Sequence, residues 1–188
     1  MAEVASQRLT TVFLDRDGVI NAKVPEGDYV KSWSQFSFLP GALDGLRALA
    51  EHGLRIVVVT NQRGIARGAM TEDDLADIHA RMRSAVEAAG GRIDAIYHCP
   101  HAGNCDCRKP APGMLHAAAR DHADLRFDES ALVGDRVHDM QAASAVGALR
   151  LYIRGFDEPL PDVDHASDDL LGAASWLVSI TDRERVPS

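Results

Sequence analysis

The chain has 188 residues, of which 46% are hydrophobic and 26% are charged, and its formal net charge is −8. These values suit one globular domain over residues 1–188. The acidic charge argues against nucleic-acid binding, which needs a basic surface, and no run approaches the roughly 20 apolar residues of a membrane span. Residues 1–10 contain no apolar signal-peptide core. We therefore expect a cytoplasmic monomer without a nucleic-acid or membrane partner, with residues 1–9 flexible.

Strand-like and helix-like segments alternate along the chain. Short apolar runs predict strands at 11–14, 54–59, 93–97 and 131–133, and alternating residues predict a half-exposed strand at 149–153. Apolar residues at helical spacing predict helices at 43–50, 71–89, 112–122, 137–146 and 169–180. Thr71 and Asp74 have the spacing of a capping box at the start of the second helix. This order predicts an α/β fold, a Rossmann-like three-layer sandwich with a mostly parallel central sheet.

Polar residues follow the predicted strands at the points where the strands end. Asp15 and Asp17 come after the first strand, Thr60 after the second and Asp135 after the fourth. Gly18 can turn the chain sharply behind the two aspartates. Because ligands bind at the carboxyl ends of parallel strands, we expect these groups to converge there. Taken alone, an acidic pair before a glycine also fits a calcium loop or a plain turn.

Two further segments have the residue types of a phosphate site and a metal site. Arg108 and Lys109 precede a predicted helix, whose N-terminus favours anions, although an exposed basic loop is the alternative. Asp135 is well placed for Mg²⁺, a hard ion that takes oxygen ligands. Asp139 lies one helical turn further on, where it could orient a ligand of the metal. A helix-capping carboxylate and a surface acid are the alternatives for this pair.

All the cysteines of the chain lie in one short segment beside a histidine. The candidate ligands are Cys99, His101, Cys105 and Cys107. Three thiols and one imidazole match a closed tetrahedral zinc site, which leaves no open position for catalysis. We therefore predict a structural zinc that fixes the loop before Lys109, with three reduced cysteines as the alternative. His98 is expected to end a strand, and the other histidines, His79 among them, to have packing or surface roles.

The order of these motifs resembles that of the haloacid dehalogenase superfamily of phosphotransferases. The resemblance runs from about residue 12 to about residue 146 and rests on Asp15-x-Asp17, Thr60, Lys109 and Gly134-Asp135-x3-Asp139. The zinc loop narrows it to the subgroup that contains heptose bisphosphate and histidinol phosphatases. The short span 18–59, with one predicted helix, leaves no room for a large cap domain. Only three residues separate His101 from Cys105, a shorter loop than in the heptose enzymes.

The resemblance implies a Mg²⁺-dependent phosphatase that acts on a phosphorylated sugar through an aspartyl-phosphate intermediate. Asp15 would attack phosphorus, and Asp17 would act as general acid and then as general base. A carboxyl that acts as an acid near neutral pH needs a raised pKa, so we expect a raised pKa for Asp17. Thr60 and Lys109 would stabilise the phosphoryl oxygens.

Two sets of binding residues follow from the same resemblance. The expected Mg²⁺ ligands are Asp15, the backbone carbonyl of Asp17, and Asp135, with Asp139 behind them. The expected substrate contacts are Asn61, Gln62, Arg63, Arg108 and Arg136. The alternative functions are histidinol-phosphate phosphatase, a non-catalytic zinc module that binds sugar phosphates, and a nucleic-acid 3′-phosphatase, which the acidic charge disfavours.

Overall fold

The computed structural model describes residues 8–25, 27–154 and 161–182. In this part of the chain six strands form one sheet in the order β3-β2-β1-β4-β5-β6, and every neighbouring pair is parallel. The strands are β1 (Thr11–Leu14), β2 (Arg55–Asn61), β3 (Ala95–Cys99), β4 (Ser130–Gly134), β5 (Leu149–Ile153) and β6 (His165–Ser167). The prediction of an α/β fold with a parallel sheet is confirmed.

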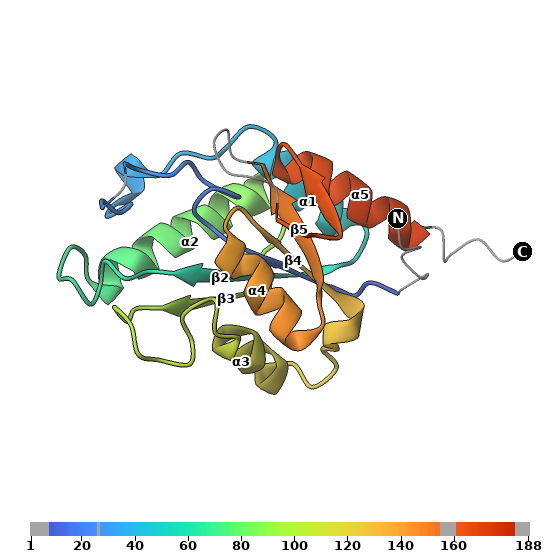
Figure 1. Ribbon diagram of the computed structural model, residues 1–188. Coiled ribbons are helices and arrows are strands. Elements are labelled where there is room, and N and C mark those ends of the chain that lie inside the picture. Colours follow the sequence, from blue (N-terminus) through green and yellow to red (C-terminus); the bar gives the residue numbers. More distant parts are fainter. Residues whose placement is uncertain (1–7, 26, 155–160, 183–188) are drawn as a thin grey trace, which may run out of the picture.

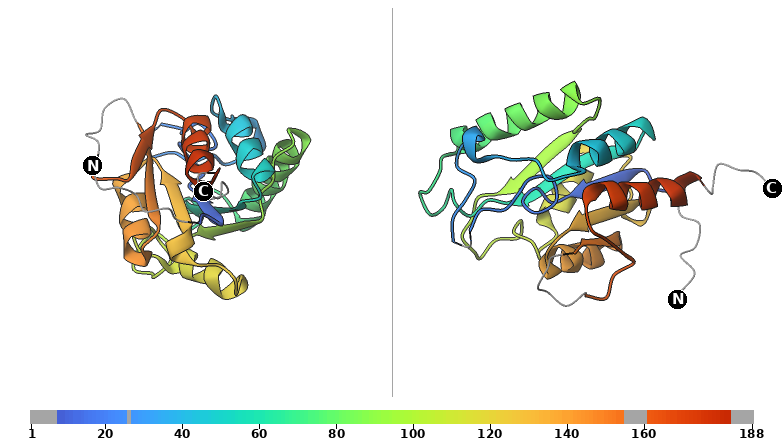
Figure 2. Two further views of the ribbon diagram at one scale, coloured as in Figure 1. Left: turned by 90° about the vertical axis from the view of Figure 1, so that its right-hand side faces the viewer. Right: turned by 90° about the horizontal axis from the view of Figure 1, so that it is seen from above.

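Helices cover both faces of the sheet (Figures 1 and 2). They are α1 (Ala42–Glu51), α2 (Glu72–Ala88), α3 (Gly113–Asp121), α4 (Val137–Val146) and α5 (Leu170–Asp182), with 3₁₀ helices η1 (Trp33–Gln35) and η2 (Phe127–Glu129). On one face, α1, α2 and α5 bury Leu46, Met82 and Leu177 in the main core. On the other face, α3 and α4 bury Leu115 and Met140. This is the predicted three-layer arrangement.

The strand bounds differ from the predicted ones at two places. β2 continues through Thr60 and Asn61, which pair with β3, whereas the predicted strand ends at residue 59. β6 is missing from the prediction because its three residues are too few to form a recognisable pattern. Since β6 pairs with the outer edge of β5, Leu151, Tyr152 and Ile153 are buried, and the expectation of a half-exposed strand is wrong.

The start of α2 has the predicted capping box. Thr71 Oγ1 accepts a hydrogen bond from the backbone N–H of Asp74 (3.1 Å), and the Asp74 carboxylate accepts one from the backbone N–H of Thr71 (2.8 Å). Two backbone donors that would lack partners at a helix start are satisfied in this way. The capping box fixes the start of the helix that carries His79.

The described chain between β1 and β2 contains only η1 and α1, so this region has no large cap domain, as predicted. Within the segment 1–9, residues 1–7 lie outside the described residues, and Leu9 is buried in the main core. Among the described residues no helix has the length and apolar character needed to cross a membrane. The loops that follow β1, β2 and β3 gather at the left of Figure 1, at the carboxyl edge of the sheet.

Candidate active site

The carboxyl ends of three neighbouring strands bring the predicted catalytic groups together. β1 pairs with β2 on one side and with β4 on the other, so Asp15, Thr60 and Asp135 reach the same edge of the sheet. Lys109 Nζ lies 2.9 Å from Asp15 Oδ1 and 2.8 Å from Asp139 Oδ1. The predicted convergence is therefore present, with a lysine ammonium between two carboxylates.

Burial and opposite charges set the protonation of this cluster. Burial raises the pKa of the Asp15 carboxyl to about 6, since it penalises the charged form by more than Lys109 favours it. Burial alone would lower the pKa of Lys109, but the carboxylates of Asp139 and Asp15 outweigh it and raise that pKa. Lys109 therefore stays cationic at neutral pH. It also donates a hydrogen bond to the carbonyl of Val59 (2.7 Å), which ties it to the end of β2.

Three buried carboxylates form a group that could hold a metal ion. Asp15, Asp135 and Asp139 each offer an oxygen, and these oxygens lie within 4.8 Å of one another. One oxygen of Asp135 is paired with Lys23 Nζ, whereas its Oδ1 is buried without a hydrogen-bond partner in the described chain. Such oxygen ligands suit a hard cation such as Mg²⁺. Gly18, at φ +98°, lies so close that any side chain there would collide with the Asp135 carboxylate.

The side chains of Asn61, at the end of β2, and of Gln62, just after it, bind neighbouring residues as well as facing the site. Asn61, predicted to contact substrate, exchanges two hydrogen bonds of 3.1 Å with the backbone of Lys109. Gln62 Nε2 donates to Thr60 Oγ1 (2.9 Å) and to Asp17 Oδ2 (2.8 Å). Both amides therefore orient predicted catalytic groups, a role that the sequence analysis did not give them.

The carboxylate of Asp17 is not part of the metal-binding group and faces Arg16. Arg16 Nη2 donates to both of its oxygens, at 2.9 and 3.1 Å, and Asn21 and Gln62 each donate one more hydrogen bond. Burial works to raise the pKa of Asp17, but Arg16 and these hydrogen bonds outweigh it and hold the pKa below its ordinary value. The expectation of a raised pKa is therefore wrong for the free protein.

Sequence analysis missed Arg16, and it gave His79 only a packing or surface role. Arg16 is fully buried, and its Nη1 lies 3.2 Å from Nε2 of His79 on α2. A signal for His79 was available, because it lies among Leu75, Ile78 and Met82 on the buried side of α2. That spacing turns a side chain toward the interior, where a polar group needs a partner.

A cavity of about 240 Å³ opens beside Asp15 and Asp17. Its lining includes all the side chains predicted to contact substrate: Asn61, Gln62, Arg63, Arg108 and Arg136. Lys23, Tyr29 and His138 also line it, although the sequence analysis named none of them as a substrate contact. The surplus of cationic groups on its wall suits an anionic ligand such as a phosphate ester.

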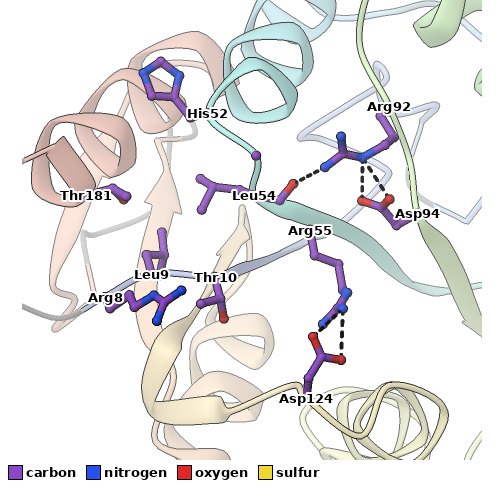
Figure 3. Close-up of a pocket in the computed structure, with 11 residues that line it drawn as sticks. Arg8, Leu9, Thr10, His52, Leu54, Arg55, Arg92, Asp94, Asp124 and Thr181 are labelled. Atoms are coloured by element: carbon purple, nitrogen blue, oxygen red, sulfur yellow. Dashed lines mark hydrogen bonds and ion pairs between the residues drawn. The ribbon is translucent and has the colours of Figure 1, made fainter. Parts of the chain in front are cut away.

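A larger cavity, of about 610 Å³, lies at the opposite edge of the sheet (Figure 3). None of the predicted site residues lines it. Arg92 is paired there with Asp94, and Arg55 with Asp124, so these charges already have partners. The groups that could perform chemistry are gathered around the smaller cavity.

The residues predicted to bind zinc lie together after β3. Ligand atoms within 4.8 Å of one another come from Cys99, His101, Cys105 and Cys107. Cys107 Sγ lies 3.1 Å from Cys99 Sγ and 3.2 Å from His101 Nδ1. His98 is outside this group, and its Nε2 lies 2.9 Å from a carboxylate oxygen of Glu72. The four side chains could hold a metal ion just before Lys109 in the chain.

Comparison with known sequences places the chain in a family. A family model described as polynucleotide kinase 3 phosphatase matches residues 12–168. The D-glycero-β-D-manno-heptose-1,7-bisphosphate 7-phosphatase of Escherichia coli is 35% identical over 193 residues, which cover 97% of this chain and 99% of that protein. The protein of the same name from Neisseria meningitidis serogroup B is 42% identical over 178 residues, which cover 89% of this chain and 94% of that protein.

Solved structures agree with the sequence comparison. A D,D-heptose 1,7-bisphosphate phosphatase from B. bronchiseptica, complexed with magnesium and phosphate, has a TM-score of 0.83 at 34% identity and covers 91% of this chain and 99% of that chain. A HAD-like phosphatase from Mesorhizobium loti has a TM-score of 0.76 at 30% identity, and the match covers 97% of this chain and 90% of that chain. The resemblance found in the sequence is confirmed, and the chain belongs to the haloacid dehalogenase superfamily, in the phosphatase family of these heptose bisphosphate phosphatases.

Proposed function

We propose that this chain is a Mg²⁺-dependent phosphatase that removes the 7-phosphate from D-glycero-D-manno-heptose 1,7-bisphosphate. One domain over residues 1–188 would carry the activity. The observation that carries the proposal is the position of Asp15 Oδ1, 2.9 Å from Lys109 Nζ and beside a cavity lined by arginines. The choice of substrate is supported by the relatives, which bear this name at 35% and 42% identity.

The first step transfers the phosphoryl group to the protein. A carboxylate oxygen of Asp15 attacks phosphorus, the new O–P bond forms, and the bond from phosphorus to the sugar oxygen breaks. Asp17 donates a proton to the departing oxygen. Because the pKa of Asp17 is lowered in the free protein, Asp17 takes this proton from solvent only when the phosphoryl dianion arrives beside it and raises that pKa. Lys109 and Thr60 stabilise the phosphoryl oxygens.

The second step returns the enzyme to its starting state. Water attacks the phosphorus of the aspartyl phosphate, and the bond to Asp15 breaks. Asp17, now a carboxylate, takes the proton from this water and gives it to solvent when inorganic phosphate leaves. Mg²⁺ held by Asp15, the backbone carbonyl of Asp17 and Asp135 would offset the repulsion between carboxylates and phosphate in both steps. Asp139, paired with Lys109, orients the ammonium group.

The cavity wall supplies the contacts that select the substrate. Arg63, Arg108 and Arg136 are proposed to bind the part of the sugar bisphosphate that keeps its phosphate, since guanidinium groups bind phosphate through paired hydrogen bonds. Asn61 and Gln62 line the same cavity while holding Lys109 and Asp17. A substrate with a second phosphate would use this cationic wall more fully than a simple monoester.

Zinc is the metal proposed for the cysteine–histidine group after β3. Thiolate and imidazole ligands favour zinc, and four protein ligands leave no open position, so its role would be structural. The metal would fix the loop that leads into Arg108 and Lys109. Thiolates of this kind persist in a reducing compartment, which supports a cytoplasmic enzyme, and we propose that it acts as a monomer.

Turnover of a substrate panel by the purified protein tests the proposal. The panel is the heptose 1,7-bisphosphate, histidinol phosphate and a 3′-phosphorylated oligonucleotide, each assayed with Mg²⁺ and with a chelator of divalent cations. We expect the highest kcat/KM for the heptose bisphosphate, release of phosphate from C7 only, and loss of turnover with the chelator. A higher kcat/KM for either other substrate would overturn the substrate assignment, and binding without turnover would favour a non-catalytic module.

A further inference from the structure

The largest fully buried side chain of the described protein is that of an arginine, Arg16, which lies between the two aspartates of the first motif. Its Nη2 contacts both oxygens of Asp17, and its Nη1 contacts Nε2 of His79. Its Nε is buried without a hydrogen-bond partner among the described residues. The charged end of this fully buried arginine is thus held by one carboxylate and one imidazole nitrogen.

The backbone of Arg16 is as firmly held as its side chain. Its N–H donates to Asp15 Oδ1 (2.7 Å), and its carbonyl accepts hydrogen bonds from the N–H groups of Ile20 (2.9 Å) and Asn21 (3.0 Å). The turn that orients the proposed nucleophile therefore also fixes the starting point of the Arg16 side chain. Its far end is fixed by α2, an element that supplies no group to the cavity.

His79 acts as a neutral acceptor toward Arg16. A guanidinium group can only donate hydrogen bonds, so Nε2 of His79 must accept one and its proton must be on Nδ1. Burial and the neighbouring Arg16 charge lower the pKa of His79 to about 3, which keeps the ring neutral. A neutral acceptor leaves the whole charge of Arg16 available to Asp17.

A continuous chain of contacts leads from α2 to the phosphate-binding end of β2. His79 contacts Arg16, Arg16 contacts Asp17, Gln62 joins Asp17 to Thr60, and each contact is between 2.8 and 3.2 Å. The carboxylate of Asp17 is therefore held from both sides. Its orientation depends on a residue of α2 that lies outside the cavity.

We propose that Arg16 and His79 are positioning residues for Asp17, which hold its carboxylate in the orientation needed to protonate the departing sugar oxygen. The inference rests on the proposed phosphatase function, in which Asp17 is the general acid. Neither residue would touch the substrate. Their loss would misplace the acid without removing the nucleophile Asp15 or the phosphate-binding Lys109.

Substrates that differ in their leaving group provide the test. A sugar or glycerol oxygen needs a proton to depart, whereas 4-nitrophenolate is stable enough to leave without one. The measured quantity is kcat/KM, which reports the steps up to formation of the aspartyl phosphate, in which Asp17 acts only as an acid. For Arg16→Met we expect kcat/KM to fall about 100-fold with the sugar phosphate, and to change little with 4-nitrophenyl phosphate.

The control is Arg55→Met at the opposite edge of the sheet, which breaks a pair of the same geometry with Asp124 and should change neither kcat/KM value. Equal losses with both substrates in Arg16→Met would assign a structural role only and overturn the inference. Unchanged kcat/KM with both substrates would overturn it as well.

Two more variants keep the test decisive if Arg16→Met fails to fold. Arg16→Lys keeps the charge but cannot reach both Asp17 and His79, and His79→Leu removes the acceptor that supports the guanidinium group. Each should show the same selective loss at smaller size, and equal losses with both substrates would overturn the inference. If the wild-type protein does not hydrolyse the heptose bisphosphate, the proposed substrate is wrong. The role of Arg16 can still be decided by comparing the kcat/KM values for glycerol phosphate and 4-nitrophenyl phosphate.

Discussion

Two arginine–aspartate pairs at opposite edges of the sheet have nearly the same geometry in different surroundings. In each pair one Nη2 atom donates to both carboxylate oxygens, at 2.9 and 3.1 Å between Arg16 and Asp17 and at 3.0 and 2.8 Å between Arg55 and Asp124. The side chains of Arg16 and Asp17 are 0% and 29% exposed, whereas those of Arg55 and Asp124 are 24% and 73% exposed. Figure 3 shows the second pair. The geometry of the hydrogen bonds alone does not separate the proposed functional pair from the surface pair, whereas burial does.

The two cavities beside these pairs lead to the same conclusion. The cavity beside Arg55 is about 610 Å³ and the one beside Asp17 about 240 Å³. In the smaller one, two lining groups, the Tyr29 hydroxyl and Arg108 Nη1, are buried without hydrogen-bond partners in the described residues. Each such atom costs about 1–3 kcal/mol unless a ligand satisfies it. Unsatisfied polar groups, rather than volume, therefore distinguish the cavity of the candidate active site.

Removal of the proposed nucleophile should have the largest effect on activity. It should also distinguish the two edges of the sheet most clearly. An amide cannot form the aspartyl phosphate, so Asp15→Asn should lower kcat by about 10⁴-fold or more. Asp124→Asn, the matched change at the opposite edge, should leave kcat unchanged. Release of inorganic phosphate measures both, and thermal unfolding verifies that both variants are folded. Wild-type turnover by Asp15→Asn would rule out the covalent mechanism.

The contributions of the two edges to stability can be compared by breaking a buried ion pair at one edge and an exposed ion pair at the other. Lys109 is buried between Asp15 and Asp139, so Lys109→Met leaves buried carboxylates unpaired and should destabilise the fold by about 3–5 kcal/mol. Arg55→Met breaks a largely exposed pair and should cost less than about 1 kcal/mol. Denaturant unfolding measures both free energies. Equal losses of unfolding free energy in the two variants would mean that the Lys109 ion pairs are solvated and that burial does not distinguish the two edges.

Much of the site could be predicted because parallel strands end at one edge. Asp15 and Asp135 directly follow β1 and β4, and Thr60 lies near the end of β2. Because these strands are neighbours in the sheet, the convergence of the three residues could be predicted from the strand assignments alone. The cysteine–histidine group could be predicted from spacing along the chain, since its members are close in sequence. These inferences depend on local pattern and on the general geometry of sheets.

The orientation of Asp17 could not be predicted, and the reason is a contact distant in the sequence. Its carboxylate faces Arg16 because α2 places His79 behind the guanidinium group. No local pattern around Asp17 reveals which helix covers that side of the turn. For the same reason the predicted sign of its pKa shift was wrong, because the prediction took no account of the cation that outweighs burial.

Removal of the proposed zinc should affect the carboxyl edge alone. Cys107→Ser removes one of four ligands, so the protein should lose its zinc, and kcat/KM should fall about 10- to 100-fold as the loop that places Lys109 loosens. The control is His98→Gln, a neighbour outside the group, which should keep zinc and activity. Metal analysis and phosphate release measure both variants. Full activity in zinc-free protein would contradict the proposed role of the loop.

Acid should destabilise the protein through His79. Its pKa is about 3 when folded and 6.5 when unfolded, so below pH 6.5 the unfolded state binds more protons and stability falls as the pH falls toward 3. The contribution is about 1.4 kcal/mol per pH unit within that window. His79→Leu should lose this part of the dependence of stability on pH, and His116→Gln, a change at an exposed histidine, should keep it. Identical slopes in all three proteins, measured by denaturant unfolding, would mean that His79 is solvated.

The smallest effect should come from the capping box of α2. A change there tests whether the start of this helix helps to position the residues of the site. Thr71→Ala removes the hydroxyl that accepts from the Asp74 N–H and should cost about 1 kcal/mol of stability, while Thr71→Ser should keep the cap. His79 lies two turns further along α2, beyond the first turn that a lost cap frays. We therefore expect unchanged kcat/KM with both sugar and 4-nitrophenyl phosphates. A loss confined to the sugar phosphate would mean that fraying reaches His79 and that the start of α2, too, supports Asp17.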